Sequence, residues 1–231
     1  MNMKSFFLVV SLVFILPAIA LAESWNQLLT VVVETPAGDV QASSISSVDI
    51  TPPSEFFKGD VGNATILTFG EAFFVQITKR RRLFVLVDGM EYWAMSALRA
   101  QGAKGSMAKV ASAFANFNEV IPLNVGGSRR YHSYPTLIVF DDENRPETAR
   151  IIPPANLAAE FGTGVHLKAM LIQRTNQPVA KGEIYRTLTW LSGFSANRLC
   201  GADRESEEIP DCRRIKLFDL ITYNLHRELT K

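Results

Sequence analysis

The sequence has little cysteine and little histidine, with two cysteines and three histidines among 231 residues. His132, His166 and His226 lie far apart, without the His-x-x-x-His or Glu-x-x-His spacing of a metal site. The chain also lacks a Gly-x-Ser-x-Gly nucleophile elbow, a P-loop and a dinucleotide-binding fingerprint. We therefore expect no metal and no cofactor, and the sequence gives catalysis little support.

The chain also has no excess of either charge. Lysine and arginine number 24 and aspartate and glutamate 23, which leaves a net charge of +1. General nucleic-acid binders neutralise many phosphates, so this balance argues against nucleic acid as a partner. With 47% hydrophobic and 20% charged residues, the composition is that of a globular protein and excludes a disordered, collagen-like or coiled-coil chain.

The first 22 residues have the pattern of a secretory signal peptide. A short segment with one lysine, Met1–Lys4, precedes the apolar run FFLVVSLVFIL, and Ala20-Leu21-Ala22 places small residues where a signal peptidase reads them. We predict cleavage before Glu23, which leaves no stable membrane span. The alternative is an uncleaved membrane anchor, although 18 residues from Ser5 to Ala22 fall just short of the usual ~20.

Cys200 and Cys212 fit an exported protein. They flank the polar, acidic segment GADRESEEIPD, and in an oxidising compartment such a pair predicts a disulfide. A redox-active pair has two residues between its cysteines, whereas here there are eleven. Zinc would need further cysteine or histidine ligands nearby, and this segment has none. We therefore interpret the pair as a structural disulfide.

Short apolar strands joined by turns dominate the rest of the chain. We expect hairpins over 28–50 and 72–87, a helix over 106–117, a strand over 136–140 that pairs with 148–152, a helix over 154–161, and a strand over 165–174. Residues 184–191 fit either a strand or a helix. From Arg213 onward, apolar residues recur every three or four positions and predict an amphipathic helix.

Consecutive hairpins followed by mixed elements favour an α+β fold, mainly antiparallel, with a few packed helices. We expect residues 23–231 to form a single exported domain. Any boundary within that domain would fall near residues 89–103, where the character of the sequence changes.

Several strings together resemble a family of uncharacterised exported proteobacterial proteins of about 200 residues. They are VETPAGDVQASSISSV, GEAFFVQI with RLFVLV, YPTLIVFDDENRP, ANLAAEFGTGVHLKAM and TWL, and the resemblance runs with gaps from about Leu29 to Leu191. The resemblance implies an envelope location in a Gram-negative bacterium, so we expect a periplasmic or secreted protein, or one anchored in the inner membrane if the leader is retained. It implies no reaction, ligand or partner.

Two basic clusters are candidate anion-binding sites. Lys79, Arg80, Arg81 and Arg82 form the basic tip of the second hairpin, and Arg129 and Arg130 follow Gly126-Gly127 in a loop. Arginine binds phosphate and carboxylate groups bidentately, and glycine allows close approach of the backbone. Basic hairpin tips are also common solubilising features, so each cluster has a purely structural interpretation as well.

The functional hypothesis from the sequence is a non-catalytic binding or scaffolding module whose partner is an envelope protein or an anionic envelope component. The alternative is a periplasmic hydrolase that uses Asp141, Asp142 and His132, which lie at the two ends of one expected strand. Asp141-Asp142 also starts an ordinary turn, where aspartate is favoured. Whether the protein is an enzyme stays open, with the balance against it.

Overall fold

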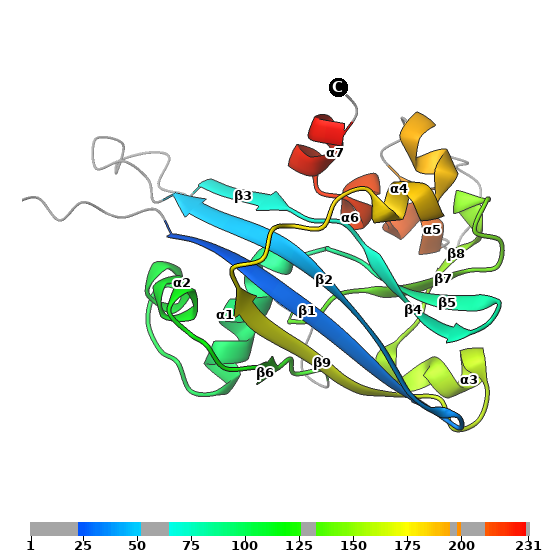
Figure 1. The fold of residues 1–231 in the computed structure, drawn as a ribbon, viewed down its shortest axis with the longest axis horizontal. Helices are drawn as coiled ribbons and strands as arrows, with labels where there is room; N and C mark the ends of the chain where they lie inside the picture. Colours follow the sequence, from blue (N-terminus) through cyan, green and yellow to red (C-terminus); the bar gives the residue numbers. More distant parts are fainter. Residues whose placement is uncertain (1–22, 52–64, 126–132, 195–197, 200–210, 230–231) are drawn as a thin grey trace, which may run out of the picture.

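The computed structural model describes residues 23–51, 65–125, 133–194, 198–199 and 211–229. These residues form two antiparallel sheets and several helices, which confirms the α+β class (Figure 1). The first sheet has the strand order β3–β2–β1–β9–β6 and contains β1 (Glu23–Thr35), β2 (Gly38–Thr51), β3 (Thr65–Phe69), β6 (Ile121–Pro122) and β9 (His166–Thr175). The second has the order β4–β5–β7–β8 and contains β4 (Phe73–Thr78), β5 (Arg81–Val85), β7 (Leu137–Phe140) and β8 (Ala149–Ile151).

The described helices gather in three places. The α-helices are α1 (Met90–Ala100), α2 (Met107–Ala115), α3 (Leu157–Phe161), α4 (Glu183–Thr187), α5 (Asp211–Arg214), α6 (Leu217–Leu220) and α7 (Tyr223–Leu229). Short 3-10 turns are η3 (Pro146–Thr148), η4 (Pro154–Asn156) and η5 (Thr189–Gly193). In Figure 1, α1 and α2 lie together at one end, and α3 lies near the β1–β2 turn. α4 to α6 lie over the second sheet, and α7 lies beside β3 of the first sheet.

The first sheet is built on the long hairpin of β1 and β2, whose ladder runs from Glu23 opposite Ile50 to Thr35 opposite Gly38. Alternate residues of β1 are buried, from Trp25 to Val33, because successive side chains point to opposite faces of a strand. The expected 28–50 hairpin is therefore confirmed, and it is longer than the apolar pattern indicated.

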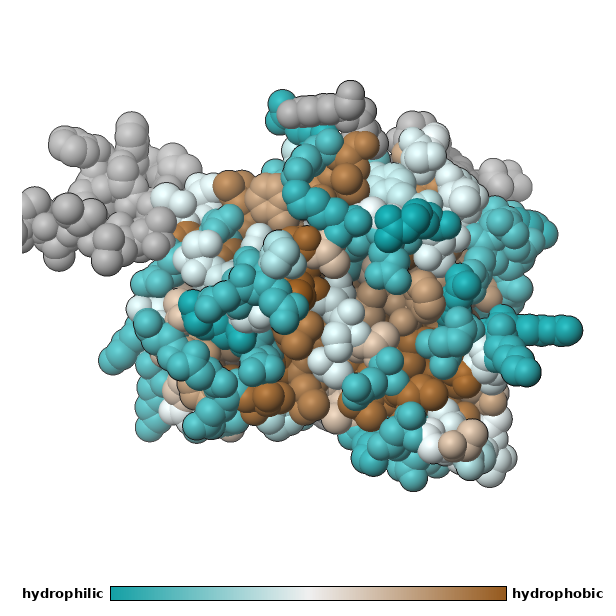
Figure 2. All heavy atoms as spheres, viewed as in Figure 1, coloured by the Kyte–Doolittle hydropathy of each residue, from teal (hydrophilic) through white to brown (hydrophobic). Residues whose placement is uncertain are grey.

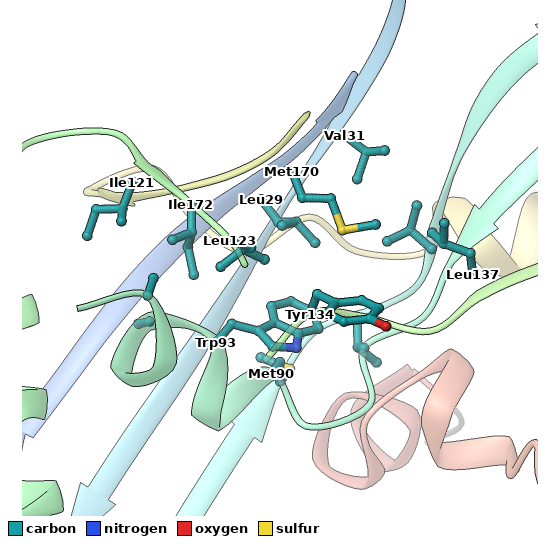
Figure 3. Close-up of a cluster of buried hydrophobic side chains, with 14 of the residues drawn as sticks. Leu29, Val31, Met90, Trp93, Ile121, Leu123, Tyr134, Leu137, Met170 and Ile172 are labelled. Carbon is teal, nitrogen blue, oxygen red and sulfur yellow. The ribbon is translucent and has the colours of Figure 1, made fainter. Parts of the chain in front are cut away.

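The larger core lies between the inner face of the first sheet, one face of the second sheet, and α1 and α2. Figure 3 shows how Met90 and Trp93 of α1 approach Leu29 and Met170 of the first sheet. Burial of such side chains supplies most of the folding free energy.

A second core lies on the opposite face of the second sheet. Phe84, Ile138 and Phe140 point away from the larger core and pack against helices of the C-terminal part, including Leu191 and Leu220. The second sheet is thus the middle layer of the molecule, and the β5 and β7 side chains alternate between two apolar environments. This alternation positions the candidate site described below.

Gly70 marks the point where the chain passes from the first sheet to the second. A Cβ atom there would lie 2.9 Å from the Cβ of Ser46, which is too close for any real side chain. The Gly70 carbonyl accepts a hydrogen bond from the Thr222 amide at 3.0 Å. The position therefore requires glycine because two other segments approach its backbone.

The C-terminal stripe is divided among three short helices and not carried by one continuous helix. Ile221 has extended backbone angles and pairs with Glu71, so the chain leaves the helical conformation after α6. Leu225 is fully buried, whereas Phe218 is 38% exposed. The periodic spacing placed Leu225 of α7 in the core correctly, but Leu229 of the same stripe is 40% exposed. The spacing also missed the two interruptions, because they arise from pairing of the chain with residues 198–199 and with residues 70–72.

Candidate functional site

The candidate site is built on the turn between β4 and β5, where Lys79 and Arg80 form the tip. The Thr78 hydroxyl accepts hydrogen bonds from the backbone amides of Arg80 and Arg81, at 3.4 and 3.1 Å. These amides are therefore used within the turn itself. Any ligand at the tip must be held by the side chains of Lys79 and Arg80, both of which are exposed.

Arg81 and Arg82 belong to β5, not to the turn, and their side chains point to opposite faces of the second sheet. Arg81 lies on the face of the larger core, where it pairs with Glu160 of α3 and its guanidinium carbon is 5.3 Å from the ring centre of Phe161. Glu160 also binds Arg150 of β8 at 3.0 Å. Arg81 is therefore fixed within the fold.

Arg150 continues this network to Asp141, 2.8 Å away, at the end of β7. The Arg150 guanidinium lowers the pKa of both Glu160 and Asp141, through hydrogen bonds to each carboxylate. In turn, the two carboxylates raise the pKa of Arg150. Charges of both signs are thus paired along one face of β5, β7 and β8.

Arg82 lies on the opposite face of the sheet. Its guanidinium carbon is 4.5 Å from the centre of the Phe74 ring, and its Nη1 is 2.8 Å from Glu143 Oε2. The Glu143 carbonyl accepts a hydrogen bond from Trp190 Nε1 at 2.8 Å, which ties the β7–β8 turn to η5. Arg82 therefore joins the two turns, and both are anchored to the smaller core.

Between the two turns lies a pocket of about 560 Å³. Its lining residues are Gln76, Lys79, Arg80, Arg81, Arg82, Val139, Phe140, Asp141, Asp142 and Glu143. Figure 2 shows hydrophilic residues gathered over this end of the molecule. Within the described part of the chain, Lys79 and Arg80 are the lining cations without an ion pair.

The structure thus brings together two groups that the sequence analysis treated separately, the basic tip and Asp141-Asp142. Asp142 has the expected turn role, because its Oδ1 accepts a hydrogen bond from the Asn144 amide at 3.0 Å. Arg129, Arg130 and His132 lie outside the described residues, as does Cys200, and the side chain of Cys212 is not described either. The second basic loop, the histidine of the hydrolase hypothesis and the disulfide therefore stay predictions.

Sequence reasoning missed Glu71, which is only 1% exposed. Its carboxylate accepts hydrogen bonds from the amides of Gly182, Glu183 and Ile184 at the start of α4. Burial raises the pKa of Glu71 even though these hydrogen bonds oppose the change. The sequence around Glu71 gave no signal for a buried carboxylate, because the hydrogen-bond partners of Glu71 lie more than 100 residues away.

Tyr185 and His226 form another pair on the C-terminal side. The Tyr185 hydroxyl is hydrogen-bonded to His226 Nδ1, and the two rings are stacked with centres 6.2 Å apart. Burial raises the pKa of Tyr185. His226 is half-buried and also contacts the Phe218 ring of α6.

Among the described residues, no group of three or more histidine, cysteine, aspartate or glutamate side chains could hold a metal ion. No helix in the described ranges is both long and apolar enough to cross a membrane. Comparison with known proteins finds no matching family model, no matching curated protein and no matching solved structure. The resemblance to the exported proteobacterial family stays a prediction.

Proposed function

We propose that this protein is an exported, non-catalytic binding module of the bacterial envelope, and that Lys79 and Arg80 bind acidic groups of an envelope partner protein. The observation that carries the proposal is a pair of exposed cations that have no ion pair among the described residues. They lie at the rim of a pocket whose other arginines are held by carboxylates. Fixed neighbours hold the backbone of the turn in place, so binding needs to order only the side chains of Lys79 and Arg80.

The hydrolase alternative finds less support at the same pocket. Asp141 is paired with Arg150, which lowers the pKa of its carboxyl group and makes it a weak base and an ineffective acid near neutral pH. Asp142 accepts hydrogen bonds within its own turn. A general acid or base for hydrolysis usually has its pKa moved toward neutrality, which is the opposite of what Arg150 does to Asp141.

The export part of the proposal rests on the leader sequence. Ala20-Leu21-Ala22 places small residues where a signal peptidase reads them, directly before Glu23. Glu23 itself pairs with Ile50 in the first sheet. An envelope location would bring the basic tip close to acidic surfaces of neighbouring exported proteins.

The test replaces both free cations in a Lys79→Ala/Arg80→Ala variant. The probe is a dye-labelled, amidated heptapeptide with a threonine–serine host sequence and two glutamates, and binding is followed by fluorescence anisotropy at low salt. Exposed ion pairs contribute roughly 0.2–1 kcal/mol each, so we expect loss of the two to weaken binding by about two- to thirtyfold. Binding should also weaken as the salt concentration rises, because exposed charges are screened.

The matched control is Lys104→Ala/Lys109→Ala, which removes the same charge from exposed positions around the α1–α2 connection. We expect this control to bind like the unchanged protein. Equal weakening of peptide binding in both variants would show that binding depends only on the net charge of the protein. It would contradict a binding site at the β4–β5 turn.

A further inference from the structure

The pocket lies where two neighbouring strands separate. β5 and β7 are paired only at Phe84 opposite Ile138 and Val85 opposite Leu137. On the far sides, β5 stays paired with β4 as far as Arg81, and β7 stays paired with β8 as far as Phe140. The sheet therefore has a notch between Arg81–Arg82 and Val139–Phe140, and these residues line the pocket together with the two turns.

The notch presents backbone hydrogen-bonding groups as well as side chains. In an antiparallel strand the N–H and C=O groups of alternate residues point to opposite edges. The Leu86 amide donates to the Thr136 carbonyl across the β5–β7 junction, and the Asp141 amide donates to Thr148 on the β8 side. The same alternation turns the backbone groups of Arg82 and Phe140 toward the notch, where no pairing between β5 and β7 continues.

The charges around the notch have both signs. Four cations line it from the β4–β5 side, and Asp141, Asp142 and Glu143 line it from the β7–β8 side. Once the ion pairs between described residues are counted, the charged groups of the lining left without one are Lys79 and Arg80 on one wall and Asp142 on the other. A ligand with only negative groups would satisfy the first wall and be repelled by the second.

We propose that the ligand of this notch is an extended peptide segment that carries an acidic and a basic side chain. Its acidic side chain meets Lys79 and Arg80, its basic side chain meets Asp142, and its main chain supplies donors and acceptors for Arg82 and Phe140. Backbone pairing with an open strand edge gives affinity, and the flanking side chains give specificity. This inference rests on the proposed function, since it names the class of partner for the same basic tip.

The experiment uses four dye-labelled heptapeptides with one threonine–serine host sequence and two variable positions two residues apart. These positions carry Glu and Lys, Glu and Glu, Lys and Lys, or Gln and Gln. We expect the Glu/Lys peptide to bind about fivefold more tightly than the Glu/Glu peptide at low salt. In amide NMR spectra of the protein, its addition should shift the signals of Arg82 and Phe140.

The decisive variant is Asp142→Asn, which keeps a side-chain oxygen for the Asn144 amide and removes only the charge. It should abolish the advantage of the Glu/Lys peptide and should not weaken binding of the Glu/Glu peptide. The matched control Glu119→Gln makes the same charge change at an exposed loop position and should alter neither.

The outcomes separate the two proposals. If the Glu/Glu peptide binds at least as tightly as the Glu/Lys peptide and still needs Lys79 and Arg80, the function stands and the mixed-charge ligand is wrong. If the Gln/Gln peptide binds as well as the Glu/Lys peptide, charge does not select the ligand and the inference fails. If no peptide binds, or binding ignores Lys79 and Arg80, both proposals fail.

Discussion

At the scale of single residues, Arg150 is the centre of the ion-pair network beside the pocket, and the exposure of its partners decides what it contributes. The Glu160 side chain is only 11% exposed, so its pair with Arg150 is less screened than an ordinary surface pair. We expect Arg150→Gln to lower the free energy of unfolding by about 1–2 kcal/mol at pH 7. Urea unfolding followed by tryptophan fluorescence measures this difference.

The same variant makes a pH prediction. Arg150 lowers the pKa of Glu160 and of Asp141. The two carboxylates therefore stabilise the folded protein at pH values above the ordinary carboxyl pKa near ~4. This stabilisation is lost as the pH falls through their lowered pKa values in the folded protein. The difference between the unchanged protein and Arg150→Gln should therefore shrink between pH 7 and pH 3.

Arg145→Gln is the matched control, because its partner Glu147 is 46% exposed and their pair should contribute little. A cost as large as that of Arg150→Gln, or an Arg150→Gln effect that does not shrink in acid, would show that burial of Glu160 is not what matters. Glu71 behaves in the opposite way to Glu160, because burial raises the pKa of Glu71. The contribution of Glu71 to the free energy of unfolding is therefore present at low pH and is lost as the pH rises through the raised pKa.

At the scale of elements, local patterns were sufficient wherever a strand or helix buries one regular face. The two hairpins, the paired strands β7 and β8, and α2 all followed from spacing and turn residues. Residues 184–191, which fitted either type, are helical in α4 and η5. α1 and β3 were not predicted, since α1 is apolar on most sides and β3 is short.

At the candidate site, too, the features with a local sequence pattern could be predicted and the others could not. The basic tip and the Asp142 turn could be predicted because their signals lie within a few residues of one another. The pocket could not be predicted, because it depends on where β5 separates from β7, and those strands are more than 50 residues apart. The role of Glu160 could not be predicted for a similar reason. Nothing near Glu160 in the sequence indicates that it forms ion pairs with Arg81 of β5 and Arg150 of β8.

α7 illustrates how a short terminal element is held by a few contacts. Its Leu225 is fully buried, and Asn224 donates a hydrogen bond to the Thr68 carbonyl of β3 at 3.1 Å. A seven-residue helix is not stable alone, so this docking determines whether it forms. We expect Leu225→Ala to destabilise the protein by about 2 kcal/mol. Amide hydrogen exchange should then be faster in β3, whose edge α7 covers.

Leu229→Ala is the matched control, because it changes the same residue type on the same helix where the side chain is 40% exposed. We expect a change below about 0.5 kcal/mol and unaltered exchange in β3. Comparable destabilisation by both variants would mean that α7 is held by a different face from the one seen here.

At the scale of the whole molecule, the second sheet is shared by two cores, and the candidate pocket lies at its end, where residues alternate between both. Movement of either turn would disturb ion pairs on one face and aromatic contacts on the other. The arrangement suits a rigid binding surface, since each fixed arginine is held by a carboxylate and an aromatic ring.

Glu23 pairs with Ile50 at one end of the β1–β2 ladder, and the sequence directly before it predicts signal-peptide cleavage. We expect export in a Gram-negative host to yield a mature chain that starts at Glu23, as measured by intact mass of the periplasmic fraction. Ala20→Arg/Ala22→Arg should block processing, because a signal peptidase requires small residues at these two positions. Leu21→Gln, at the position between them, should still be processed. A chain that keeps Met1–Ala22 and sediments with membranes would instead establish the uncleaved anchor, and the basic tip would then act beside the inner membrane.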